Sequence, residues 1–216
     1  RREDQALQPR QGAPGVGRQE LIHKLSIQGL KSIQKVDVPL GPFTAFIGAN
    51  ASGKSNLLDG LRVIQGLALG HVVRDVFDGR HEEATRNRWP GVRGGARYAC
   101  WMPASGEASS GTVDIEVEFE VDDVRLSWFV SLDPRNGVIR GESLRHVDGG
   151  GGAMYDTMPV EQPGGGDPSL IARVYKGKGG GGGKAPHIPF SNSVAILTQM
   201  RGERAVVPSN EQVALK

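Results

Sequence analysis

The sequence predicts a mixed α/β fold, and two kinds of pattern in its 216 residues lead to that expectation. In the first half of the chain, a glycine-rich motif lies between a short apolar run and a segment whose apolar residues recur at helical spacing. Farther along, apolar and polar residues alternate strictly over two consecutive segments. Helical spacing is typical of a helix packed on one side, and alternation is typical of a half-buried strand. With 38% hydrophobic residues, a chain of this length can bury one sizeable core.

The glycine-rich motif occupies residues 48–55, which read G-A-N-A-S-G-K-S and match the pattern G-x-x-x-x-G-K-[ST] in full. In this pattern the glycines let backbone N–H groups converge on a phosphate without side-chain obstruction. Lys54 is expected to place its ammonium group against the β- and γ-phosphates, and Ser55 to supply one oxygen ligand to Mg²⁺. The motif therefore predicts a site for a nucleotide and Mg²⁺. The motif residues expected to contact the nucleotide are Gly48, Ala51, Ser52, Gly53, Lys54 and Ser55.

The segments on both sides of the motif agree with this interpretation. The apolar run at residues 43–47, F-T-A-F-I, predicts a strand that enters the motif directly. Downstream, the spacing predicts a helix that stops at Gly70. Gly60 and Gly66 each lower the stability of that helix by about 1 kcal/mol relative to alanine, so packing on a sheet is expected to hold it. Its apolar stripe consists of Leu57, Leu61, Ile64 and Ala68, widened by Leu58.

A wider pattern surrounds the motif. Its parts are a strand-like segment ending in Lys31-Ser32, a second one at residues 36–40, the run at residues 43–47, and the loop G-x-N-x-S-G-K-S-N at residues 48–56. In this order the segments resemble the amino-terminal lobe of an ABC-type ATPase head, in the RecF, SMC and OLD-like branch of the AAA-family "predicted ATPases". The resemblance implies an α/β P-loop NTPase fold with an added antiparallel β-subdomain.

The resemblance also carries expectations about ligands and partners. It implies that ATP is the nucleotide, that Asn50 lies near the γ-phosphate and that Lys31 can approach the nucleotide, although position 31 equally suits a solvated loop lysine. Asn56, directly after the motif, favours the DNA-linked members over a transporter subunit. The resemblance further implies a homodimer formed through the nucleotide-binding face and a role in DNA repair, recombination or defence.

An ABC-type site also needs an apolar run ending in Asp-Glu and a signature loop, and neither pattern occurs in this sequence. Catalytic residues are therefore unknown and are expected outside these residues. Two hypotheses stay open: an ATPase head that hydrolyses ATP within a longer or dimeric protein, and a non-hydrolysing nucleotide-binding switch that drives dimerisation. In either case the chain alone is expected to bind ATP without turnover.

Arginines are frequent between residues 74 and 97, where they are interleaved with carboxylates. Mixed charge is typical of a solvated face. A surface that binds DNA is the alternative, although few aromatic residues are interleaved with the cations. The arginines are Arg74, Arg80, Arg86, Arg88, Arg93 and Arg97.

The alternating segments at residues 113–121 and 124–132 predict two strands of an antiparallel meander. A turn at residues 133–137 then leads into a third strand. The resemblance assigns this meander, about residues 111–147, to the β-subdomain of an ABC-type head. The acids at residues 114, 116, 118 and 120 have a regular period of two, which indicates the wet face of a strand and not a catalytic array.

The predicted organisation is a disordered segment at residues 1–20, a P-loop ATPase lobe at residues 21–205 and a tail at residues 206–216. The tail is expected to be a truncation before the catalytic lobe. Glycine runs predict flexible loops at residues 149–152, 164–166 and 177–183. A strand is expected at residues 170–175 and helical spacing occurs at residues 191–200.

Composition limits the remaining functions. A net charge of +2 demands no polyanionic partner, and the single Cys100 excludes an internal disulfide and suits a reducing, cytoplasmic location. No apolar run approaches the roughly 20 residues of a membrane span. The five histidines are scattered, so the sequence predicts no metal centre apart from Mg²⁺ at Ser55.

Overall fold

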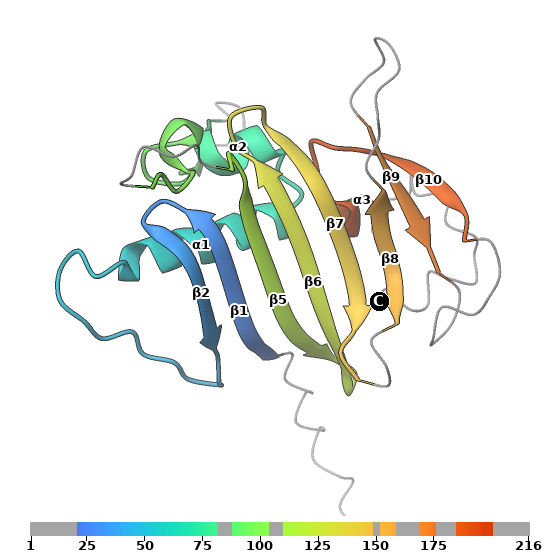
Figure 1. The fold of residues 1–216 in the computed structure, drawn as a ribbon, viewed down its shortest axis with the longest axis horizontal. Helices are drawn as coiled ribbons and strands as arrows, with labels where there is room; N and C mark the ends of the chain where they lie inside the picture. The colour runs from blue at the N-terminus through green and yellow to red at the C-terminus, as the bar shows by residue number, and fades with distance from the viewer. Residues whose placement is uncertain are drawn as a thin grey trace, which may run out of the picture.

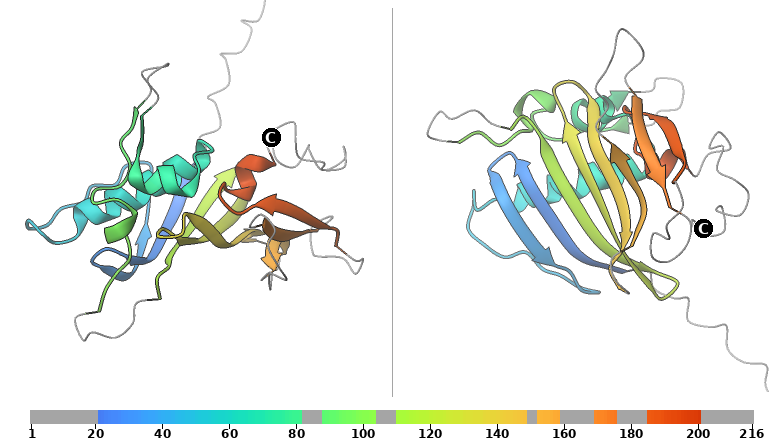
Figure 2. Two further views of the ribbon diagram at one scale, coloured as in Figure 1. Left: turned by 90° about the horizontal axis from the view of Figure 1, so that it is seen from above. Right: turned by 45° about the vertical axis from the view of Figure 1, so that its right-hand side comes forward.

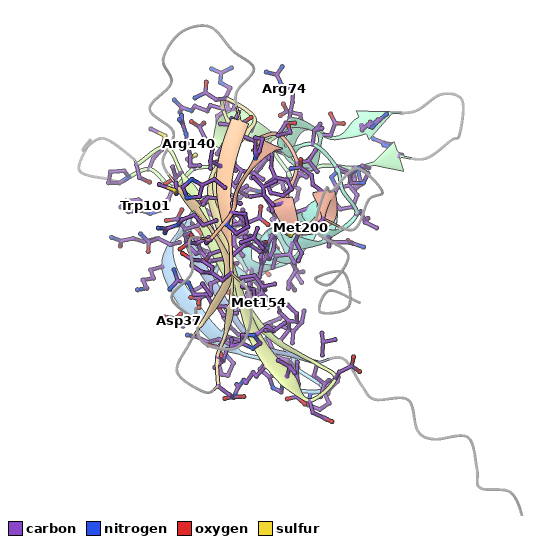
Figure 3. All side chains as sticks on the ribbon, turned by 90° about the vertical axis from the view of Figure 1, so that its right-hand side faces the viewer. Asp37, Arg74, Trp101, Arg140, Met154 and Met200 are labelled. Atoms are coloured by element: carbon purple, nitrogen blue, oxygen red, sulfur yellow. The ribbon has the colours of Figure 1, made fainter. Side chains whose placement is uncertain are left out.

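The computed structural model describes residues 21–81, 88–103, 110–148, 152–158, 169–175 and 185–200. Within these residues, an eight-stranded antiparallel sheet carries helices on one of its faces (Figures 1 and 2). In a view turned by 90°, Asp37 lies on the open side of the sheet and Met200 on the helix side (Figure 3). The predictions for residues 1–20, 149–151, 164–166, 177–183 and 206–216 lie outside the described part of the chain.

The strand order in the sheet is β10-β9-β8-β7-β6-β5-β1-β2. Neighbours in this order are consecutive in the chain except β5 and β1, between which the P-loop and the first two helices are inserted. The strands are β1 (Leu21–Leu30), β2 (Ile33–Pro39), β5 (Val113–Val121), β6 (Val124–Asp133), β7 (Val138–His146), β8 (Ala153–Met158), β9 (Ser169–Val174) and β10 (His187–Ser191). The insertion holds α1 (Lys54–Ala68), α2 (Val73–Asp78), the short pair β3 (Arg80–His81) and β4 (Arg88–Trp89), and the 3-10 turn η1 (Ala96–Tyr98).

The predicted meander is confirmed. β5 pairs with β6 along its whole length, and β6 pairs with β7. Val113, Ile115 and Val117 are buried. The acids between them lie on the open face, where the Ser127 hydroxyl donates a 2.6 Å hydrogen bond to Glu116. The β5 carboxylates therefore form a polar outer face, as their period of two indicates.

The predicted helix is confirmed as α1, but its buried face differs from the predicted stripe. Leu57, Gly60, Val63 and Leu67 are buried, whereas Ala68 is exposed. The reason is a close approach: a Cβ atom at Gly60 would lie 2.3 Å from Cδ1 of Ile27 on β1. The glycine lets the helix lie directly on the sheet, and packing thereby offsets the low helix propensity of glycine.

The strand predicted at residues 43–47 is wrong in this structure. The segment is not a strand, makes no backbone hydrogen bond to another described residue, and leaves Phe43 87% and Ile47 95% exposed. A strand requires a partner whose backbone groups complete the ladder. The neighbouring edge strand β2 pairs with β1 and not with this segment, so an apolar run alone does not produce a strand here.

The last part of the chain packs on the sheet through a buried carboxylate. The strand expected at residues 170–175 is confirmed as β9, and the helical spacing at residues 191–200 yields only the short α3 (Ile196–Gln199). Glu142 on β7 is 1% exposed and accepts hydrogen bonds from the backbone N–H groups of Ile196 at 2.7 Å and Leu197 at 3.0 Å. The carboxylate thus caps α3 and fixes it to the sheet.

Candidate nucleotide-binding site

The glycine-rich motif forms an irregular loop that leads directly into α1. Two of its residues have left-handed backbone conformations, Ala51 with φ of 63° and Gly53 with φ of 92°. Glycine adopts this region freely, whereas for an L-residue it costs about 1–2 kcal/mol. Gly53 is the N-terminal cap residue of the helix, so the left-handed conformation falls where the loop turns into α1.

Backbone donors are free where the loop meets the helix. Within the described residues, the N–H groups of Gly53, Lys54 and Ser55 donate to no protein acceptor, while those of Asn56 and Leu57 already bond to the carbonyl of Gly53. The first turn of α1 contains no acidic residue. Free N–H groups and the positive end of a helix dipole attract an anion.

The Lys54 side chain folds into the same loop. Its ammonium nitrogen donates to the carbonyl oxygens of Gly48 at 2.6 Å and Ala49 at 2.5 Å, and to the Ser52 hydroxyl at 3.3 Å. These bonds hold the positive charge inside the loop. That Lys54 serves a phosphate stays a prediction.

The other predicted residues lie around the same helix end. Ser55 and Asn50 are exposed. A serine hydroxyl at this end fits Mg²⁺, because this ion takes one or two oxygen ligands from protein and the rest from phosphates and water. Nucleotide-bound Mg²⁺ would therefore be held by Ser55 and would neutralise phosphate charge.

The turn between β1 and β2 also reaches this region. The Asn56 side-chain amide donates to the Ser32 hydroxyl at 2.6 Å, which joins α1 to the turn. The neighbouring Lys31 has a left-handed backbone with φ of 52°, and its Nζ donates to Asp59 on α1. The structure thus brings Lys31 and Ser32 to the P-loop helix, but the Lys31 ammonium binds the Asp59 carboxylate there.

Sequence reasoning missed two residues of this region, Asp59 and Arg93. Asp59 is 2% exposed and binds Lys31 and Arg93. Burial acts to raise the pKa of Asp59, but hydrogen bonds from Arg93 and Lys31, together with their charges, outweigh burial and hold that pKa below its ordinary value. An aspartate one helical turn beyond the motif, at a position that α1 buries, was the only signal for this ion pair in the sequence.

Arg93 was grouped with arginines predicted to form a solvated or DNA-binding face, and the structure separates that group. Arg93 pairs with Asp59, Arg80 lies 3.8 Å from Asp75, and Arg97 stacks on the Tyr98 ring. Arg86 lies outside the described residues.

A glycine-rich loop that ends in lysine at the start of a helix is the phosphate-binding element of P-loop NTPases. Residues 43–98, which hold this loop, α1, α2 and η1, match a family model described as "AAA domain, putative AbiEii toxin, Type IV TA system". None of the curated proteins matches the chain. The match supports an AAA-type ATPase domain with nucleotide binding, and the narrower RecF, SMC and OLD-like group remains a prediction.

No helix among the described residues is both long and apolar enough to cross a membrane. No group of three or more His, Cys, Asp or Glu side chains in the described ranges could hold a metal ion.

Proposed function

We propose that the chain binds Mg·ATP at residues 48–56 as part of an AAA-type ATPase. The observation that carries the proposal is the convergence of donors at one place. The Lys54 ammonium lies inside the loop, and the free N–H groups of Gly53, Lys54 and Ser55 lie at its exit into α1. This arrangement offers positive charge and directed hydrogen bonds to a polyphosphate and has little use in a purely structural turn.

The proposal is tested by replacing Lys54 with alanine. Loss of an ammonium beside several phosphate charges is expected to weaken Mg·ATP binding by at least about a hundredfold, corresponding to roughly 3 kcal/mol. Isothermal titration calorimetry measures the affinity, and circular dichroism checks the fold. Ser55→Ala should weaken binding of Mg·ATP more than binding of metal-free ATP. Wild-type affinity in Lys54→Ala would exclude the site.

We further propose that ATP binding serves a DNA-linked process in the cytoplasm, with a homodimer formed through the nucleotide-binding face. The support is the order of segments from Lys31-Ser32 to Asn56 and the single cysteine. Dimerisation that depends on ATP, measured by analytical ultracentrifugation, would support a homodimer formed through the nucleotide-binding face. A chain that stays monomeric with and without ATP would contradict it.

A non-hydrolysing switch is the second candidate function, and one observation favours it. Within the described residues, no carboxylate hydrogen-bonds to Lys54 or Ser55. Phosphoryl transfer to water needs a group that orients the attacking water as well as positive charge on the phosphates. The described residues supply the charge, so binding is the better supported activity of the chain.

A further inference from the structure

Three cations surround one buried carboxylate beside the P-loop helix. An Asp59 oxygen lies 2.5 Å from Lys31 Nζ, 2.8 Å from Arg93 Nη2 and 3.7 Å from Arg62 Nη1. Among the described residues, no second carboxylate lies within ion-pair distance of these cations. The cluster therefore has positive charge in excess, and such a surplus attracts an anion.

The cluster adjoins the phosphate loop. Arg93 Nη2 lies 3.4 Å from the side-chain oxygen of Asn56, the residue directly after Ser55. The other end of the Asn56 amide reaches Ser32, whose hydroxyl would lie 3.8 Å from a Cβ atom at Gly53. Arg93 therefore stands on the flank of the same helix end that carries the free N–H groups.

The Arg93 guanidinium is anchored along one edge and open along the other. Its Nε and Nη2 donate to Asp59 at 3.2 and 2.8 Å. Nη1 donates to no acceptor in the described part of the chain, and the side chain is 57% exposed. A planar guanidinium held this way can present its remaining N–H groups to a second anion.

The loop that carries Arg93 is held by contacts on both sides of that residue. The N–H of Val92, which is 3% exposed, donates to the carbonyl of Phe77 at 2.9 Å. A Cβ atom at Gly91 would lie 2.6 Å from that carbonyl, so the chain passes α2 at a distance only glycine permits. On the other side of Arg93, the N–H of Ala96 donates to the Asp78 carboxylate at 2.8 Å. An exposed charged side chain on a rigid loop is typical of a binding residue.

We propose that Arg93 contacts the phosphates of the bound nucleotide and that Asp59 is the residue that positions it. This inference rests on the proposed function and extends the site beyond residues 48–56. The phosphate would accept hydrogen bonds from the open edge of the guanidinium while Asp59 keeps the other edge. Charge-assisted hydrogen bonds of this kind are stronger than neutral ones.

The experiment measures Mg·ATP affinity of the full chain by calorimetry. Arg93→Ala is expected to weaken binding about tenfold, and Arg93→Lys to recover only part of it, because an ammonium cannot bond to two anions in a planar fork. Arg97→Ala is the matched control: it removes an exposed arginine four residues away that stacks on Tyr98 and takes no part in the cluster, and it should leave the affinity unchanged.

The positioning role is tested with Asp59→Asn in two backgrounds. The substitution should weaken binding severalfold in the wild-type chain and less in Arg93→Ala, because residues that act through one another are not additive. A purely structural role of Asp59 would give the same loss in both backgrounds, which would overturn the positioning role. Thermal unfolding without nucleotide shows that each variant folds.

The outcomes separate this inference from the function on which it rests. Full affinity in Arg93→Ala together with lost affinity in Lys54→Ala overturns the role of Arg93 and leaves the P-loop site intact. Full affinity in both variants excludes nucleotide binding at this loop, and the role of Arg93 with it.

Discussion

At the scale of single residues, the site depends on a backbone conformation as much as on side chains. Gly53 has φ of 92° at the cap of α1, and its N–H is one of the free donors. An alanine there would be strained by about 1–2 kcal/mol in the left-handed region. The loop can relieve this strain by rotating its peptide groups, which would turn the donors away from the phosphate.

Gly53→Ala is therefore expected to weaken Mg·ATP binding by about tenfold or more and also to lower thermal stability. Gly70→Ala is the matched control, since Gly70 has φ of 81° beyond the other end of α1 and a Cβ atom there would meet nothing within 4 Å. It should lower stability by a similar amount without changing affinity. Equal affinities of the two variants in titration calorimetry would show that the Gly53 backbone does not aim the donors.

At the scale of elements, close packing and one buried carboxylate fix the helices on the sheet. Gly60 lets α1 lie against Ile27, and Glu142 caps α3. Glu142 also accepts hydrogen bonds from Trp128 at 2.9 Å and Tyr155 at 2.7 Å, so one side chain links β6, β7, β8 and α3. Burial raises the pKa of Glu142 above its ordinary value of 4.5, although these hydrogen bonds oppose the shift.

This direction predicts how stability depends on pH. A carboxyl whose pKa is higher in the folded state contributes stability fully below its unfolded pKa and loses it as pH rises through the folded pKa. Glu142→Gln removes this titration, so the variant should gain stability relative to wild type as pH rises above about 4.5. Between the unfolded and folded pKa values, this gain in the free energy of unfolding approaches about 1.4 kcal/mol per pH unit. Urea unfolding of both proteins between pH 4 and 8 measures the difference. If the wild type instead gained stability relative to the variant as pH rises over this range, the four hydrogen-bond donors around Glu142 would outweigh burial and lower its pKa.

At the scale of the whole molecule, the helices cover one face of the sheet and the apolar segment before the P-loop has no partner strand in the described structure (Figure 2). Phe43 and Ile47 expose large side chains in the segment that leads into the P-loop, and no described carboxylate hydrogen-bonds to Lys54 or Ser55. The described residues thus place positive charge and N–H groups without a described protein acceptor at the start of α1.

The 216-residue chain is accordingly expected to bind ATP and to show negligible steady-state hydrolysis. A phosphate-release assay compares the chain with Lys54→Ala, and both should give the background rate. Hydrolysis by the wild type that disappears in Lys54→Ala would contradict this expectation.

The sequence by itself determined the P-loop, the helix that follows it and the β5–β6–β7 meander. Their signals are local: a motif of fixed spacing, and periods of two or of helical spacing that hold within one element. The places of Lys54 and Ser55 in the motif predict their roles at a phosphate and at Mg²⁺, and these roles stay predictions.

Only the tertiary structure decided what depends on partners distant in the chain. It shows that residues 43–47 pair with no strand in the described part of the chain and that Gly60 and not Ala68 faces the sheet. It also shows that Asp59 binds both Lys31 and Arg93 beside the loop. A strand forms only beside another strand that completes its hydrogen bonds. The buried face of a helix depends on which residues allow close contact with the sheet. The ion pair between Asp59 and Arg93 joins side chains that are 34 positions apart in the chain. None of these contacts leaves a local pattern in the sequence.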